Sequence, residues 1–176
     1  MKILVSEERI QAAVERVANE ILQREQGRPL TVIAIMTGSI VFLADLIRKL
    51  DMPLRVGVIQ TSSYRDGSTR GRLTINSDMM PDIKDRDVLI VDDIFDTGHT
   101  LFEVIALLDE MQPRSVKSAV LMHKVSRTEV SIKPDYVGFE IPDEFVVGYG
   151  LDYNDAYRNL PFIAVLEPQD LAEHGK

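Results

Sequence analysis

Several short stretches of this sequence are apolar at almost every position, and no other feature limits the possible fold as strongly. These stretches are LTVIAIM (residues 30–36), LRVGVIQ (54–60), DVLIV (87–91), SVKSAVLM (115–122) and EFVVGYG (144–150). Strands that are apolar on both faces are typical of parallel sheets covered by helices on both sides. Residues 7–26, 40–50 and 99–112 place apolar side chains at helical spacing. We therefore predict an α/β fold with a central, mainly parallel sheet flanked by helices.

The whole chain, residues 1–176, is predicted to form one domain. It has 176 residues, of which 45% are hydrophobic, and it contains no internal repeat, low-complexity tract or long linker. A chain of this length buries about 70% of the surface that its unfolded form exposes. The first helix is expected to begin after Ser6 as its N-cap and to end before Gly27 and Pro29.

The composition excludes several classes of function. With 28 acidic and 20 basic residues the net charge is −8, so the chain as a whole repels nucleic acid and anionic membranes. The absence of cysteine excludes disulfides, thiolate catalysis and cysteine-bound zinc. No apolar run approaches the roughly 20 residues of a membrane span, and the first ten residues lack the apolar core of a secretion signal. We expect a cytoplasmic protein that binds neither nucleic acid nor a membrane.

Three carboxylates, Asp92, Asp93 and Asp96, follow the apolar stretch 88–91. Burying this much charge at the end of a strand is costly unless a cation or sugar hydroxyls act as partners. The next residues, DTGHT at 96–100, form a turn whose glycine and hydroxyls suit a phosphate at a helix N-terminus. A ligand that carries phosphates, hydroxyls and bound Mg²⁺ would satisfy both features.

A second turn of this kind, MTGS at residues 36–39, follows the strand predicted at 30–36. Ligands of open parallel sheets bind beyond the carboxyl ends of the strands, so the two turns imply two anion pockets at one edge. The alternative is that Thr97, Gly98 and Thr100 only cap a helix. A cap needs one carboxylate and three are present here, which favours a ligand site.

The sequence DDIFD also matches the DDxxD motif with which terpenoid synthases chelate Mg²⁺ on a prenyl diphosphate. That motif lies within a helix of a large all-helical protein, whereas here it ends a predicted strand, so we reject this interpretation. VLIVDDIFDTGHT (88–100) instead resembles the phosphoribosyl diphosphate motif of the type I phosphoribosyltransferases at every position. The resemblance extends through residues 38–46, 61–71 and 133–163, and the last segment is characteristic of the hypoxanthine and hypoxanthine-guanine subfamily.

This resemblance implies a Mg²⁺-dependent transferase. Such an enzyme moves the 5-phosphoribosyl group from 5-phosphoribosyl diphosphate to N9 of a 6-oxopurine, hypoxanthine first and guanine second, giving IMP or GMP and diphosphate. The family also implies a small hood over the base site, a homodimer or homotetramer, and a mobile lid loop that includes Ser63 and Tyr64. A lid suits this chemistry because water would capture the oxocarbenium-like transition state. Taken alone, residues 61–71 predict only an exposed hairpin loop.

The resemblance also assigns roles to the residues of the two turns. Asp92 and Asp93 face the ribose hydroxyls, directly or through Mg²⁺, and Asp96 manages the proton on purine N7. Thr37 and Gly38 grip the diphosphate together with Arg158, although many relatives carry a basic residue where this chain has threonine. The loop around the 5′-phosphate consists of Asp96, Thr97, Gly98, His99 and Thr100.

The purine is assigned, on the same resemblance, to Lys124, Phe145, Val146 and Asp152. Lys124 donates to the 6-oxo group, Phe145 stacks on the ring, and Val146 contributes backbone contacts. Asp152 also reaches a second Mg²⁺ on the diphosphate. From the residues alone, Lys124 would be interpreted as a solvated surface lysine and Phe145 as a core residue.

One alternative function stays open at this point. Pyrimidine-operon regulators share the fold and the motif but act as nucleotide-sensing RNA-binding proteins. The acidic net charge and the purine-type segment from Lys133 to Pro161 argue against this alternative.

Overall fold

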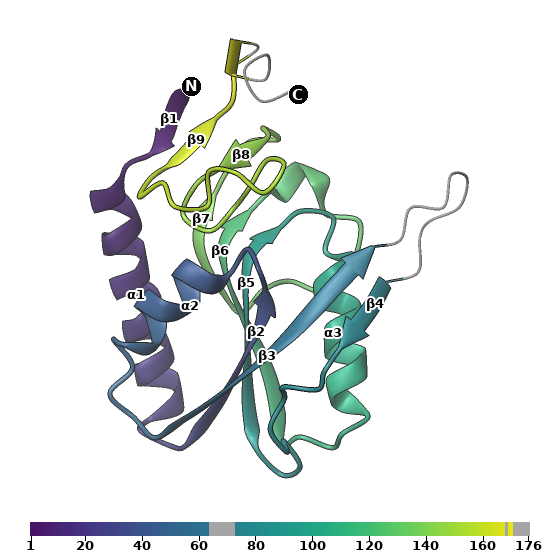
Figure 1. Cartoon of the computed structure of the whole chain (residues 1–176). Helices are drawn as coiled ribbons and strands as arrows, with labels where there is room; N and C mark the ends of the chain where they lie inside the picture. Colours follow the sequence, from purple (N-terminus) through teal and green to yellow (C-terminus); the bar gives the residue numbers. More distant parts are fainter. Residues whose placement is uncertain (64–72, 168, 171–176) are drawn as a thin grey trace.

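A computed structural model of the chain describes residues 1–63, 73–167 and 169–170. In this part of the chain, six strands form a central sheet in the order β4-β3-β2-β5-β6-β7 (Figure 1). All neighbouring pairs are parallel except β3 and β4, which are antiparallel. The predicted α/β class with a mainly parallel sheet is therefore confirmed. The strands are β2 (Leu30–Met36), β3 (Leu54–Ser63), β4 (Leu73–Asn76), β5 (Asp87–Phe95), β6 (Ser115–His123) and β7 (Tyr136–Glu140).

Helices cover both faces of this sheet, as the apolar strands require. Helices α1 (Glu7–Glu25) and α2 (Ile40–Ile47) bury their apolar residues with Val32 and Ala34 of β2. Helix α3 (His99–Asp109) packs on the other face, against Ile33 and Ile35 of the same strand. Alternate residues of β2 thus face two different cores, which explains why the strand is apolar throughout.

The first helix begins and ends close to the predicted positions. The Ser6 hydroxyl accepts a hydrogen bond from the Arg9 amide at 3.4 Å, so Ser6 is the N-cap. The last helical residue is Glu25, and Gln26 turns the chain with a left-handed conformation at φ 53°. Its amide still donates to the Leu22 carbonyl, which closes the final turn.

A second, three-stranded sheet lies apart from the central one in the described part of the chain. It consists of β1 (Lys2–Val5), β9 (Ile163–Val165) and β8 (Val146–Val147), all antiparallel. The predicted strand at 144–150 was therefore wrong in length and in sheet. Gly148 and Gly150 adopt positive φ angles of 96° and 102°, which end the strand after two residues. Together with the loop after β8, this sheet forms the hood at one end of the molecule (Figure 1).

The remaining differences from the sequence prediction concern strand ends and short strands. β5 continues to Phe95 and thus includes Asp92 and Asp93, which had been placed beyond its end. The segments of β1, β7 and β9 were not predicted, because three to five residues are too few to show a clear period. β3 and β4 form the expected hairpin, whose loop, with Tyr64 of the predicted lid, lies outside the described residues; Ser63 is the last residue of β3.

Among the described residues, no helix is long and apolar enough to cross a membrane.

Candidate active site

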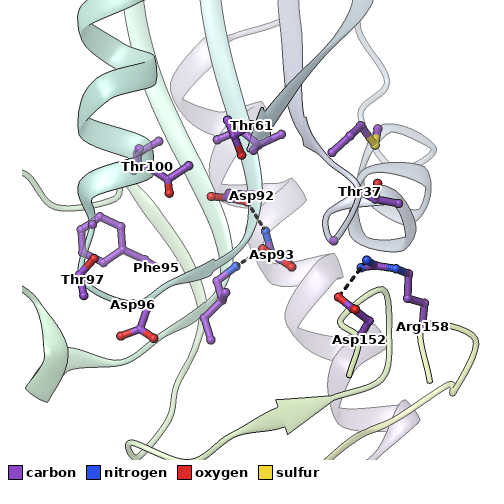
Figure 2. A pocket seen from close by; sticks show the side chains of 16 residues that line it. Thr37, Thr61, Asp92, Asp93, Phe95, Asp96, Thr97, Thr100, Asp152 and Arg158 are labelled. Atoms are coloured by element: carbon purple, nitrogen blue, oxygen red, sulfur yellow. Dashed lines mark hydrogen bonds and ion pairs between the residues drawn. The ribbon is translucent and has the colours of Figure 1, made fainter. Parts of the chain in front are cut away.

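The two turns singled out in the sequence line one cavity of about 340 Å³ at the carboxyl ends of the parallel strands β2 and β5. The two turns for which anion pockets were predicted therefore line one continuous cavity, because β2 and β5 are direct neighbours. In Figure 2, Asp92 and Asp93 lie between the turn that holds Thr97 and Thr100 and the side that holds Thr37 and Arg158. Polar side chains thus line the cavity on both of these sides and between them.

Two glycines allow close approaches between segments that border this cavity. A Cβ atom on Gly38 would lie 1.8 Å from Asp93 Oδ2, so only glycine permits this approach. A Cβ atom on Gly150, in the loop after β8, would lie 2.1 Å from the Gly38 carbonyl oxygen. Gly38, in the turn at 36–39, therefore contacts two segments. It meets the hood at Gly150 and strand β5 at Asp93.

Asp92 and Asp93 are unusual carboxylates because one is buried and the other, next to it, is half-buried. Burial raises the pKa of Asp92 well above its ordinary value, and the negative charge of Asp93 raises it further. Burial also raises the pKa of Asp93, although hydrogen bonds and the positive charge of Arg158 oppose this effect. Each carboxylate accepts one backbone amide, Asp92 from Asp93 at 3.0 Å and Asp93 from Ile94 at 2.8 Å. Both therefore have free acceptor capacity toward a ligand.

These two acids should cost stability at neutral pH, and Asp92→Asn tests this directly. A carboxyl whose pKa is higher in the folded than in the unfolded chain makes folding less favourable as the pH rises through that range. Without ligands at pH 7, the variant should unfold at a higher temperature, by roughly 2–4 °C for each kcal/mol gained. The gain should shrink as the pH falls toward the ordinary carboxyl range. Thermal unfolding at several pH values measures it.

Asp87, at the opposite end of β5, is the matched control with the opposite sign. The hydrogen bond from Arg114 lowers the pKa of Asp87 to about 2. Its contribution to stability is present above its unfolded pKa and is lost as the pH falls toward 2. Because Arg114 is 57% exposed and screened by solvent, Asp87→Asn should cost only about 1 kcal/mol at pH 7. Equal effects of the two substitutions would contradict this account.

The hydroxyl groups of Thr97 and Thr100, in the turn at 96–100, do not cap helix α3. Gly98 is the N-cap of α3 with φ 88°, and the helix receives no side-chain cap. Thr97 and Thr100 instead line the cavity, so the alternative that these residues only cap a helix was wrong. His99 does not line it, and its Nε2 lies 2.9 Å from Glu129 Oε2. In the other turn, the buried Ser39 hydroxyl donates to the Ile35 carbonyl at 2.6 Å.

A second cavity of about 180 Å³ adjoins the first and shares Asp93, Asp96 and Asp152 with it. Lys124, Phe145 and Val146, which the resemblance assigns to one ligand, all line it. The side chain of Lys124 is only 9% exposed. Phe145, by contrast, is 57% exposed. The interpretations of Lys124 as a surface lysine and of Phe145 as a core residue were therefore wrong. Phe145 meets Tyr153 edge to face, with ring centroids 5.7 Å apart.

Arg158 reaches the first cavity from the hood. Its Nη2 atom lies 2.8 Å from Asp152 Oδ1, and its Nη1 atom donates to the Gly150 carbonyl at 2.8 Å. Figure 2 shows this pair on the same side of the cavity as Thr37. Thr37 follows a cis peptide bond and is exposed. Arg158 thus places a positive charge on the side of the cavity where the Thr37 side chain is uncharged.

Three polar residues at or near the site were missed in the sequence. Thr61 of β3 lines the first cavity, and its place inside a predicted loop concealed it. Arg127 donates from Nε to Asp96 Oδ1 at 3.1 Å, and Asp143 lies 3.5 Å from Lys124. The only signal for Arg127 was its position three residues after Lys124, which is too weak to predict a contact.

Known proteins resemble this chain over nearly its whole length. A family model described as phosphoribosyl transferase domain matches residues 2–154. Hypoxanthine-guanine phosphoribosyltransferase of Staphylococcus aureus strain Mu50 is 40% identical over 169 residues, which cover 96% of this chain and 94% of that protein. A solved structure of a variant hypoxanthine phosphoribosyltransferase from Trypanosoma cruzi, complexed with the product IMP, is 39% identical. It superimposes with a TM-score of 0.90 over 98% of this chain and 93% of that one.

The similarity also reaches larger proteins. The bifunctional protein TilS/HprT of Listeria innocua is 38% identical over 173 residues, or 98% of this chain. The chain spans only 27% of the length of that relative.

Proposed function

Because this chain belongs to the phosphoribosyl transferase family, and within it to the hypoxanthine-guanine phosphoribosyltransferases, we propose that it makes IMP from hypoxanthine and 5-phosphoribosyl diphosphate, and GMP from guanine. The observation that supports this most is the pair of adjoining cavities that share Asp96. One is polar and elongated, and the other is lined by an aromatic ring and a lysine. A ribose phosphate and a purine base need these two environments side by side.

The order of groups along the first cavity matches the order of groups in 5-phosphoribosyl diphosphate. The turn at 96–100 would hold the 5′-phosphate with Thr97 and Thr100. Asp92 and Asp93 would accept hydrogen bonds from the ribose hydroxyls, and Arg158 would bind the diphosphate with the backbone of Thr37 and Gly38. The anomeric carbon would then lie toward the second cavity, in which the purine base would bind.

In the reaction, N9 of the base forms a bond to the anomeric carbon while the bond from that carbon to the diphosphate oxygen breaks. The proton on N7 must leave the base, and we assign its acceptance to Asp96, which lines both cavities. Lys124 would donate to the 6-oxo oxygen, and Phe145 would stack on the ring. Exclusion of water would fall to the lid predicted from the sequence.

The donor set is compatible with Mg²⁺. Asp92, Asp93 and Asp152 provide hard oxygen ligands, whereas the described residues contain no cluster of three or more acids or histidines that would enclose a metal alone. Mg²⁺ usually binds through one or two carboxylates, water and substrate phosphates, so this arrangement fits an ion that arrives with the diphosphate. When bound, it would neutralise negative charge that develops on the leaving diphosphate.

The function can be tested with the purified chain, Mg²⁺, 5-phosphoribosyl diphosphate and a purine, followed by separation of the nucleotide products. We expect IMP from hypoxanthine, GMP from guanine and little AMP from adenine. Comparing initial rates with hypoxanthine, guanine and xanthine would establish the preference at C2. No product with any purine would contradict the proposal. Tight RNA binding would then favour the regulator alternative, which the relatives do not support.

The family resemblance further implies a cytoplasmic homodimer or homotetramer. Light scattering coupled to size-exclusion chromatography would distinguish these assemblies.

Lys124→Ala should weaken binding of hypoxanthine and relax the preference for a 6-oxo over a 6-amino base. The buried amine would otherwise face the amino group of adenine, and an unpaired buried donor is unfavourable. We expect a roughly tenfold smaller ratio of kcat/KM for hypoxanthine over adenine. Lys49→Ala, in the turn after α2 and outside the lining of both cavities, is the control. If discrimination against adenine were unchanged, Lys124 would not read the 6-oxo group.

A further inference from the structure

Asp96 is held by two cations that approach different oxygens of its carboxylate. Arg127 Nε donates to Oδ1 at 3.1 Å, and Lys124 Nζ lies 3.5 Å from Oδ2. The two cations also share Asp143, at 3.5 Å from Lys124 and 3.8 Å from Arg127. Lys124 lines the second cavity, whereas Arg127 and Asp143 line neither cavity. The four charges therefore alternate in a ring, with one side facing the ligand and the other facing away from it.

The backbone fixes Arg127 opposite Asp96. The Lys124 amide donates to the Phe95 carbonyl at 2.9 Å, and the Glu129 amide donates to the Thr97 carbonyl at 3.0 Å. These two bonds tie the segment 124–129 to the residues immediately before and after Asp96. Between them, the Arg127 amide donates to the Lys124 carbonyl at 3.0 Å in a short 3₁₀ turn. The guanidinium group thus reaches Asp96 from a segment that is anchored on both sides.

The Lys124 amine can turn from the Asp96 carboxylate toward a purine bound in the second cavity. Its distances of 3.5 Å to both carboxylates are long for a hydrogen bond, so the amine is free to turn toward a 6-oxo group. Once it does, Arg127 is the cation that stays on Asp96, because it contacts the oxygen that Lys124 does not. The second oxygen then remains available for the proton on N7.

From this geometry we propose that Arg127 is a positioning residue for the reaction: it holds one oxygen of Asp96 so that the other faces the base. The proposal rests on the proposed function. Arg127 touches neither cavity, so its effect must pass through Asp96 and appear in turnover. Binding of 5-phosphoribosyl diphosphate, whose site lies in the first cavity, should not depend on it.

The test compares Arg127→Gln in the natural chain and in an Asp96→Asn background. In the natural chain, loss of a charge-assisted bond to a half-exposed arginine should lower kcat about tenfold, with an unchanged KM for 5-phosphoribosyl diphosphate. Arg127→Lys keeps the charge and should recover part of the loss. In the Asp96→Asn background, Arg127→Gln should have no further effect, because residues that act through one another are not additive. Single-turnover measurements with labelled hypoxanthine can detect the low rate that is expected for the double variant.

Arg48→Gln is the matched control, since Arg48 is 80% exposed and meets a carboxylate, Asp45, only at 3.9 Å. It should leave kcat unchanged. Normal turnover of Arg127→Gln, or the same loss of turnover with and without Asp96, would overturn the proposal. A natural chain that makes no IMP would instead contradict the proposed function, so the two failures are distinguishable.

Discussion

Asp96→Asn should lower kcat by about 10²- to 10⁴-fold while leaving the affinity for 5-phosphoribosyl diphosphate nearly unchanged. This is the usual contribution of a general acid or base, and the amide cannot accept the proton from N7. The substitution preserves the shape of the side chain, and the Asp96 carboxylate is paired with the side chains of Arg127 and Lys124. Initial rates at varied concentrations of both substrates separate kcat from the two KM values.

Asp143→Asn is the control for this prediction. Asp143 lies at the same 3.5 Å distance from Lys124 as Asp96 does, but it lines neither cavity. Removing its charge perturbs the lysine without removing a proton acceptor from the site. We expect a much smaller loss of turnover. Near-normal turnover of Asp96→Asn, or equal losses in both variants, would rule out proton transfer by Asp96.

Arg158→Ala should weaken the binding of diphosphate and of 5-phosphoribosyl diphosphate by roughly ten- to a hundredfold, because a charge-assisted partner contributes about 1.5–3 kcal/mol. The structure strengthens the reason for this expectation. Arg158 is paired with Asp152 at 2.8 Å, so its removal also leaves a carboxylate without its cation beside the anion. Inhibition constants for free diphosphate measure the change directly.

Thr37→Ala is the companion variant and should cost little. Thr37 is exposed, and in the proposed function the anion is bound by the backbone of the turn at 36–39 rather than by this side chain. Thr37→Lys should partly restore diphosphate binding in the Arg158→Ala background if both side chains face the same anion. A severe loss from Thr37→Ala with none from Arg158→Ala would show that the anion is held from the opposite side.

Much of the fold could be predicted from the sequence because its signals are local. A strand buried on both faces must be apolar throughout, and β2 shows this by sending Val32 to one core and Ile33 to the other. The start of α1 followed from Ser6, whose hydroxyl caps the helix. The turn at 96–100 was also predictable, because Asp92 to Thr100 are contiguous and lie at one strand end and one helix start.

Other features depended on contacts between distant segments. The residues around Val146 are apolar enough for a central strand, but two glycines with positive φ end it, and it pairs with β9 in the hood. Phe145 has the apolar side chain of a core residue but lies exposed at the second cavity. Hydrophobicity indicates that a residue favours burial, and it does not state which surface will cover it.

The sequence by itself therefore determined the order of the helices and of the longer strands of the central sheet, the class of sheet and the polar residues of the turns after β2 and β5. Only the tertiary structure decided that these turns share one cavity, that Arg158 of the hood reaches it with Asp152, and that Arg127 lies against Asp96. The physical reason is that periodicity and capping act within a few residues of the chain. Ion pairs such as that between Asp96 and Arg127 join residues 31 positions apart, and they exist only once the packed sheet has brought its strand ends together.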